Sequence, residues 1–361
     1  MNKHKENITI TYYDFADLNY ASYFLVGIYE NQTKFNFKFL VKKSIPPFLK
    51  EIDPKNDWTD ILFSICIFEV TRENESFYFC IDTRDSNTSD INLGKGFHLP
   101  LLQSVKYYFK VNYNKSVINK EIDVIKHSQK IIPAWPFFPI KFTQPFLYRP
   151  RLIPSKDIHW TYFDLRKRIK FILRNLTLRE IIDMRNSKKE RDIFFVTNFY
   201  EGELHRADNE YRYKLIYELK KKSKLNSISG FIGQNLPAKF KEFELPPFRI
   251  GDYLNELAKS KIGIYVRGLL NCISFKFGQY LALGLPIVGQ QILNNKENLM
   301  QYENFYLQFA YNEPKEIIEK AIELVQKPEM INTIGHSNAE LFDKFFHPKK
   351  TVEKILIHLF S

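Results

Sequence analysis

The chain has 361 residues, enough for two domains, and its 44% hydrophobic and 26% charged residues exclude an intrinsically disordered protein. No run reaches the roughly 18 apolar residues that a membrane helix requires. The polar start, Met1–Glu6, predicts no signal peptide, so we expect a cytoplasmic protein. Cys66, Cys80 and Cys272 show no CxxC pairing, which argues against disulfides and a zinc site. The formal net charge of +12 indicates an anionic partner: nucleic acid, a membrane leaflet or a phosphorylated substrate.

The first half of the chain consists mainly of strand patterns. A β-rich run covers Ile8–Tyr13 and stops at Asp14, and an amphipathic helix is predicted from Asn19 to Glu30. Further strands are predicted over Phe35–Val41, Ile61–Val70, Phe77–Ile81 and Val105–Tyr113. Because Asp, Asn and Gly clusters end these runs, we expect a sheet whose loops gather at its rim.

Six prolines between Pro133 and Pro154 mark the clearest domain boundary. So many prolines forbid a continuing helix or central strand. The aromatic residues among them, such as Trp135 and Phe137, favour a packed crossover over a free linker. We predict a first domain over residues 1–145, with a C-terminal helix at 346–361 packing back on it, and a second domain over residues 146–345.

The second half alternates strand and helix patterns at the spacing of a parallel sheet. Strands are predicted over Asp192–Thr197, Ser227–Ile232, Lys261–Val266 and Ile287–Gly289. Helices are predicted over Phe163–Asn175, Asn209–Lys222, Gly251–Ser260, Phe275–Leu283, Glu316–Gln326 and Lys349–Phe360. This order predicts an α/β fold with a doubly wound sheet.

The segment from Lys261 to Gln290 carries the most chemistry. It is predicted as strand, loop, helix, tight turn and strand, and ligands of such sheets bind where a strand ends and the next helix begins. Ser274 is a predicted N-cap with Phe275 and Lys276 in the first turn, which directs the positive end of the helix dipole at a ligand. Arg267 and Lys276 would add charge-assisted contacts to a diphosphate. The alternative is a helix that only packs on its sheet, with Gly284 as an ordinary C-terminal cap.

The stretch Gln279-Tyr-Leu-Ala-Leu-Gly-Leu-Pro-Ile-Val288 resembles the glycosyltransferase signature Glu-x-x-Ala-x-Gly-x-Pro-Val-Val. The resemblance is to glycosyltransferases of the GT-B kind and covers about Asp192 to Ser361. It implies two Rossmann-like doubly wound domains facing a cleft, with a nucleotide-sugar bound to the C-terminal domain. No metal cofactor is implied, because cationic side chains and a helix terminus serve the leaving group.

The resemblance also implies roles for single residues. Gln279 takes the place of the signature Glu that contacts the donor's ribose, and Asn271 takes the place of a second Glu near the sugar in retaining members. Both acidic positions are amides here, which leaves the stereochemistry of transfer open. Arg212 has the place of a residue that often reaches toward phosphate, and a solvated charge on the helix surface is the alternative for it.

Candidates for a catalytic base lie after strands of the first domain. An inverting transferase needs such a base to take the proton of the acceptor hydroxyl. Asp14 and Asp82 lead, followed by Asp17, Asp85 and His98. Each has a structural alternative, since Asp after a strand commonly caps a turn or helix.

Together these features predict a metal-independent hexosyltransferase that moves a sugar from a UDP- or GDP-sugar to a glycan or lipid-linked acceptor in cell-surface polysaccharide biosynthesis. The basic surface is assigned to this donor and to anionic lipid, which allows a peripheral place on the inner face of the membrane. No nucleic-acid motif accompanies the basic runs. A catalytically inactive glycan-binding protein and a basic nucleic-acid-binding α/β protein are the alternatives.

Overall fold

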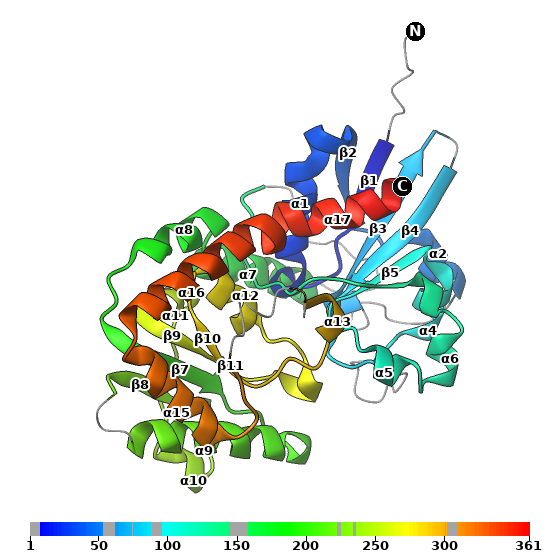
Figure 1. Cartoon of the computed structure of the whole chain (residues 1–361). Helices are drawn as coiled ribbons and strands as arrows, with labels where there is room; N and C mark the ends of the chain where they lie inside the picture. The colour runs from blue at the N-terminus through cyan, green and yellow to red at the C-terminus, as the bar shows by residue number, and fades with distance from the viewer. Residues whose placement is uncertain are drawn as a thin grey trace. The chain divides into compact units, whose positions relative to one another are not determined.

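The protein is described from a computed structural model covering residues 8–52, 62–73, 75–88, 96–144, 158–221, 225–233, 236–299, 301 and 309–361. The chain divides into two compact units (Figure 1). Unit 1 comprises residues 1–177 and 346–361, and unit 2 comprises residues 178–345. The sequence placed the first boundary at residue 145, and the compact unit extends further because α7 (Ile158–Arg174) contributes Arg168 to an ion pair with Asp14.

Unit 1 is built on a six-stranded sheet in the order β2-β1-β3-β4-β5-β6. β3 is antiparallel to both of its neighbours, and the other pairs are parallel. The short connection from β3 to β4 explains this exception, since it is too short for the crossover that parallel neighbours need. The strands are β1 (Ile8–Tyr13), β2 (Phe37–Lys42), β3 (Ile65–Arg72), β4 (Glu75–Asp82), β5 (Tyr107–Lys110) and β6 (Ile131–Pro133).

Helices cover both faces of this sheet. One face carries a row of aromatic rings on adjacent strands, Tyr12, Phe68, Phe79 and Phe109, with centroid separations of 5.2, 4.8 and 6.0 Å. α1 (Leu18–Phe35) and α17 (Pro348–Phe360) pack on this side. The other face forms a second buried cluster with short helices: α2 (Pro47–Ile52), α4 (Leu99–Ser104), α5 (Lys115–Ile118) and α6 (Ile122–Ile125).

The C-terminal helix α17 joins unit 1 through a close helix–helix contact. Gly27 of α1 lies directly against the backbone of Pro348, where any side chain would collide. The amide of Asn31, one turn later, donates to the carbonyl oxygen of Lys349 at 2.8 Å. This hydrogen bond joins two residues that are 318 positions apart in the sequence.

Unit 2 is built on a parallel sheet in the order β11-β10-β9-β7-β8. The strands are β7 (Arg191–Asn198), β8 (Ser227–Ile232), β9 (Ser260–Tyr265), β10 (Ile287–Gly289) and β11 (Phe309–Ala310). α9 (Arg206–Lys221), α10 (Ala238–Lys241) and α15 (Pro314–Val325) pack on one face through a single apolar cluster. The remaining helices are α8 (Leu178–Asp183), α11 (Ile250–Ala258), α12 (Phe275–Ala282), α13 (Lys296–Leu299) and α16 (Pro328–Leu341).

These two sheets confirm the predicted α/β class with two Rossmann-like units. The sequence did not predict α16, and it placed the start of α7 several residues too late, at Phe163. The proline-rich stretch begins at the end of β6. This strand lies at the edge of the sheet, where a proline can stand without breaking hydrogen bonds to a strand on its outer side. Pro145, Pro150 and Pro154 lie outside the described residues.

The turn between α12 and β10 has the geometry that its glycine predicts. Gly284 has φ = 63°, in the left-handed region, and its N–H donates to the carbonyl of Leu281 at 3.0 Å. The N–H of Leu285 donates to the carbonyl of Tyr280 at 2.9 Å. This pair of bonds is the Schellman motif, which ends the helix and directs the chain into β10.

Candidate functional site

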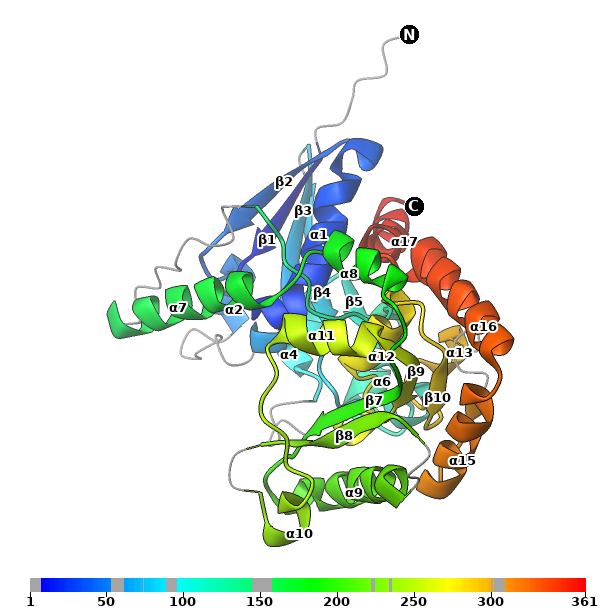
Figure 2. The same ribbon diagram turned by 90° about the vertical axis from the view of Figure 1, so that its left-hand side faces the viewer.

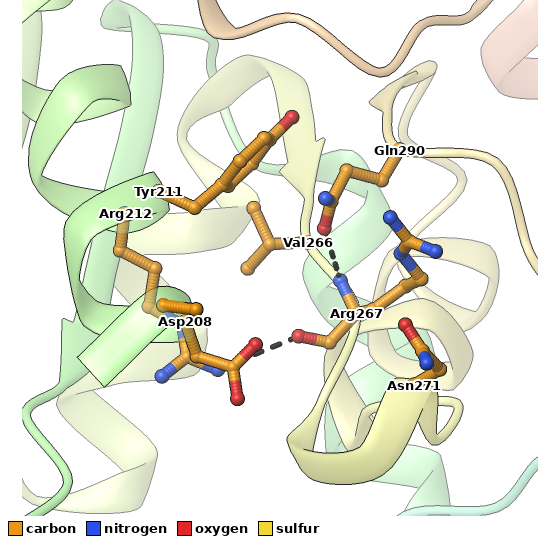
Figure 3. A pocket seen from close by; sticks show the side chains of 8 residues that line it. Asp208, Tyr211, Arg212, Val266, Arg267, Asn271 and Gln290 are labelled. Atoms are coloured by element: carbon orange, nitrogen blue, oxygen red, sulfur yellow. Dashed lines mark hydrogen bonds between the residues drawn. The ribbon is translucent and has the colours of Figure 1, made fainter. Parts of the chain in front are cut away.

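Residues that follow the parallel strands of unit 2 enclose a cavity of about 190 Å³ (Figure 3). The strand order reverses between β7 and β9, because the chain passes from β7 to β8 on one side and then to β9 on the other. Open parallel sheets bind their ligands beyond the carboxyl ends of the strands at such a point. The lining residues come from α9 and from the loops after β9 and β10: Ala207, Asp208, Tyr211, Arg212, Val266, Arg267, Asn271 and Gln290.

Arg212 is the most deeply buried charged residue of this cavity, with 3% of its surface exposed. Its guanidinium lies over the ring of Tyr200, 4.8 Å from the centroid, and Nη2 donates to the carbonyl oxygen of Arg267 at 3.4 Å. Nη1 is buried and makes no hydrogen bond within the described part of the chain. Burial lowers the pKa of Arg212, while Tyr200 and Asp208 oppose that shift. A buried guanidinium with an unused N–H is suited to bind an anionic oxygen.

Arg267 and Asn271 line the cavity from the loop between β9 and α12. The backbone N–H of Arg267 donates to Oε1 of Gln290 at 2.9 Å, which ties the loops after β9 and β10 together. In Figure 3 the side chain of Arg267 extends beside Gln290, across Val266 from Arg212. Asn271 has a left-handed backbone (φ = 62°), as does the preceding residue, and its side chain is exposed at the cavity. Three of the predicted donor-binding residues, Arg212, Arg267 and Asn271, therefore lie at one cavity.

The structure does not bring Ser274, Phe275, Lys276 or Gln279 to the lining of this cavity. Ser274 is the N-cap residue of α12, but its hydroxyl donates to the carbonyl oxygen of Val266 at 3.3 Å instead of capping the first turn. Gln279 is buried in the helix at 4% exposure. Contact of these four residues with a donor stays a prediction.

Lys276 reaches across to the carboxyl end of β7. Its Nζ donates to the carbonyl oxygen of Val196 at 2.7 Å and lies 5.1 Å from the ring centroid of Phe195. Burial and, to a lesser extent, the positive charge of Arg212 together lower the pKa of Lys276 to about 7. The positive charges of Lys276 and Arg212 repel each other near the end of β7, and a bound polyanion would stabilise both charges.

The two leading base candidates of unit 1 are both fully buried at strand ends. Asp14 accepts from Arg168 through both oxygens, at 2.9 and 3.1 Å, and forms an ion pair with Lys43 at 3.2 Å. Asp82 accepts from the hydroxyl of Tyr108 at 2.5 Å and from Nζ of Lys110 at 3.0 Å. Both carboxylates thus bind donors of the protein itself, and a catalytic role for either one stays a prediction.

Two further candidates for the catalytic base cap helices, which was the structural alternative for these residues. Asp17 caps α1 by accepting from the N–H of Asn19 at 2.8 Å. His98 caps α4 by accepting through Nδ1 from the N–H of Leu101 at 3.2 Å. Both side chains therefore serve helix ends.

Several residues of the cavity were not predicted from the sequence. Gln290 directly follows β10, so the rule that places ligands after parallel strands could have found it. The same rule points to Tyr200, two residues after β7, which does not line the cavity but supports Arg212 with its ring. Asp208 precedes Arg212 by one helical turn and Tyr211 adjoins it, but their sequence context carries no comparable signal.

Fold and cavity together define an α/β protein with two Rossmann-like units and, in the second unit, a cationic cavity at the strand-order reversal. No protein-family model matches the chain, and no curated protein matches its sequence. Solved structures do match in part, and glycosyltransferases, the class that the sequence resembles, are among them.

The chain is similar to UDP-GlcNAc 2-epimerase from Neisseria meningitidis bound to UDP-GlcNAc (11% identity, 95% of this chain and 96% of that one, TM-score 0.41). It is also similar to TarM of S. aureus in complex with UDP (10% identity, 76% and 48%, TM-score 0.41). A third similarity is to WaaG, a glycosyltransferase of lipopolysaccharide biosynthesis (12% identity, 68% and 61%, TM-score 0.39). The chain thus spans less than two thirds of either glycosyltransferase. Scores this low leave the activity to be argued from the site.

Proposed function

We propose that this chain is a glycosyltransferase that binds the diphosphate of a nucleotide-sugar in the cavity of unit 2. The observation that carries the proposal is Arg212, a buried guanidinium at the reversal of the strand order, one N–H group of which has no hydrogen-bond partner among the described residues. Arg267 adds a second positive charge to the same cavity. A phosphate ester would supply an acceptor oxygen for Nη1 of Arg212.

The reaction that fits this arrangement is transfer of a sugar with departure of the nucleoside diphosphate. The bond from the anomeric carbon to the diphosphate oxygen breaks, the acceptor oxygen bonds to that carbon, and a base takes the acceptor's proton. Negative charge develops on the leaving diphosphate, so fixed cations at its oxygens lower the barrier. Asp14 and Asp82 remain the candidates for the base, and a glycan or lipid-linked molecule is the proposed acceptor.

Calorimetric titration with UDP, GDP, CMP and uridine tests the first step. A diphosphate should bind much more tightly than uridine, because two of the lining residues, Arg212 and Arg267, are cationic. In a thermal-shift screen, a ligand at 100 times its Kd should add about 2.7 kcal/mol of stability. Absence of binding by every phosphorylated ligand would refute the proposal.

Product analysis tests the second step. The nucleotide-sugar that binds is incubated with and without a panel of glycan and lipid-linked acceptors, and products are followed by mass spectrometry and NMR. Acceptor-dependent release of the nucleoside diphosphate indicates transfer. Conversion of the donor into its 2-epimer without any acceptor would show an epimerase instead. Binding without turnover would favour a catalytically inactive binding protein.

A further inference from the structure

Helix α7 of unit 1 turns large apolar side chains toward solvent. Tyr162, Phe163, Ile169 and Leu173 are 66, 54, 46 and 79% exposed. They make up four of the fifteen large apolar side chains that are exposed in the part of the chain described here. Figure 2 shows α7 lengthwise at the outside of unit 1. A helix of a globular protein normally buries this side, so the arrangement needs a reason.

The inner side of α7 combines charged and apolar residues. Arg168 is buried and donates to Asp14 of β1's carboxyl end and, through Nε, to Asp164 of its own helix at 2.9 Å. Phe171 lies on the same side at 7% exposure, and two more apolar residues of the helix are half-buried. Ion pairs therefore help to hold α7 to unit 1, while four of its large apolar side chains stay exposed.

The exposed charges of α7 from Tyr162 onward all have one sign. Arg166, Lys167, Lys170 and Arg174 are exposed, whereas the only acidic residue of the helix, Asp164, is buried against Arg168. Lys167 Nζ lies 4.6 Å from the ring centroid of Phe163 and 5.9 Å from that of Phe63, which is itself 42% exposed. Phe63 thus extends the same surface.

We propose that this outer face of α7 is a docking surface for an anionic membrane leaflet. Aromatic and aliphatic side chains on a helix that also carries exposed Lys and Arg are the combination that lies in a lipid interface. The four positive charges match anionic headgroups, and no exposed carboxylate of α7 opposes them between Tyr162 and Arg174. The helix would lie on the membrane, because no helix in the described part of the chain is long and apolar enough to cross a bilayer.

Vesicle flotation of the full chain tests this surface. The protein should float with phosphatidylcholine vesicles that contain phosphatidylglycerol. The double variant Phe163→Ser/Leu173→Ser should lower this binding at least tenfold, because each apolar side chain removed from water contributes a factor of about ten or more. The matched control is Ile122→Ser/Ile125→Ser, which removes two comparably exposed side chains, 75 and 40%, from another helix of unit 1 and should bind as the wild type does.

A second pair of variants isolates the charge. Lys170→Gln/Arg174→Gln should weaken binding to anionic vesicles by roughly fivefold per charge. Lys115→Gln/Lys120→Gln, exposed lysines elsewhere in unit 1, should have little effect. Nucleotide binding should be unchanged in all four variants, since the cavity belongs to unit 2, so this proposal can fail while the proposed function stands.

Three results would overturn the membrane proposal. The first is absence of flotation with anionic vesicles, and the second is an equal loss of binding in the α7 double variant and its matched control. The third is a wild-type dimer that Phe163→Ser/Leu173→Ser converts to a monomer, by light scattering, without any vesicle binding. This last result would make the face a contact between two copies of the chain.

Discussion

Replacement of Arg212 by glutamine separates a binding role from a structural one. In the unliganded protein the change removes a buried N–H that has no partner in the described ranges of the chain, and burying such a group costs about 1–3 kcal/mol. It also removes the bond to the Arg267 carbonyl and the contact with the Tyr200 ring, each contributing about 1 kcal/mol. These contributions nearly cancel, so we expect the free energy of unfolding to change by less than about 1 kcal/mol and Tm by less than about 4 °C.

Ligand binding should respond very differently to the same change. Loss of one partner of a buried charge pair costs about 2–4 kcal/mol, which corresponds to a roughly 30- to 900-fold higher Kd for the nucleoside diphosphate. Calorimetric titration at constant ionic strength measures this increase. Lys214→Gln is the matched control, because it removes one positive charge from an exposed position of the same helix and should change Kd by less than about threefold.

Two outcomes would refute this reasoning. A variant that binds the nucleotide as tightly as the wild type would show that Arg212 does not contact phosphate. A variant that loses more than about 3 kcal/mol of stability would show that the guanidinium supports the fold rather than a ligand.

Three further predictions concern a proton, a backbone contact and a buried ion pair. The pKa of Lys276 is lowered to about 7 in the folded chain, in part by the charge of Arg212, so a diphosphate that neutralises Arg212 should drive proton uptake by Lys276 that is larger at pH 8 than at pH 6, measured by calorimetry in buffers of different ionisation enthalpy. Because the unfolded lysine keeps its proton up to about pH 10.5, this group should also make the unliganded chain more stable as the pH rises above 7. Gly289→Ala should destabilise unit 2 by about 3 kcal/mol in urea unfolding, since a methyl group there overlaps the carbonyl oxygen of Tyr265. Lys110→Met should cost about 3–5 kcal/mol, because it leaves Asp82 buried without its cation, and a second change, Asp82→Asn, should restore part of that loss.

Each of these predictions has a control. Proton uptake should vanish in Lys276→Met, and uptake that persists would assign the proton to another group. Gly233→Ala, whose new methyl group meets its nearest neighbours at 3.3 Å, should cost less than about 1 kcal/mol, and equal losses for both glycines would contradict the close-contact argument. Lys126→Met breaks an exposed ion pair and should change stability by less than about 0.5 kcal/mol.

Local patterns were sufficient for the strands that have clear ends. The predicted bounds of Ile8–Tyr13, Ser227–Ile232 and Ile287–Gly289 agree with β1, β8 and β10. The first of these runs is rich in β-forming side chains, and each of the three has a turn-forming residue next to at least one of its ends, so neighbours in the chain help to decide where it stops. The left-handed Gly284 belongs to the same class of local determinants.

The sequence also identified three residues of the cavity, because Arg212, Arg267 and Asn271 stand at known offsets from a strand or a signature turn. It could not show that Lys276 turns away from the cavity lining to the carbonyl of Val196, 80 positions earlier. The direction of a long side chain depends on which acceptors the fold brings within its reach.

The spacing of apolar residues and the turn-forming residues between them therefore determined the alternation of strands and helices along unit 2, the α/β class and the loops where a ligand would bind. All of these follow from residues that are close together in the chain. Tertiary structure alone decided which charges meet. Asp14 pairs with Arg168 at a separation of 154 residues, and this pairing places a charged side chain of α7 inward while four large apolar side chains of the helix stay exposed. Burial makes an unpaired carboxylate so unfavourable that its partner, wherever it lies in the sequence, determines how the helix is oriented.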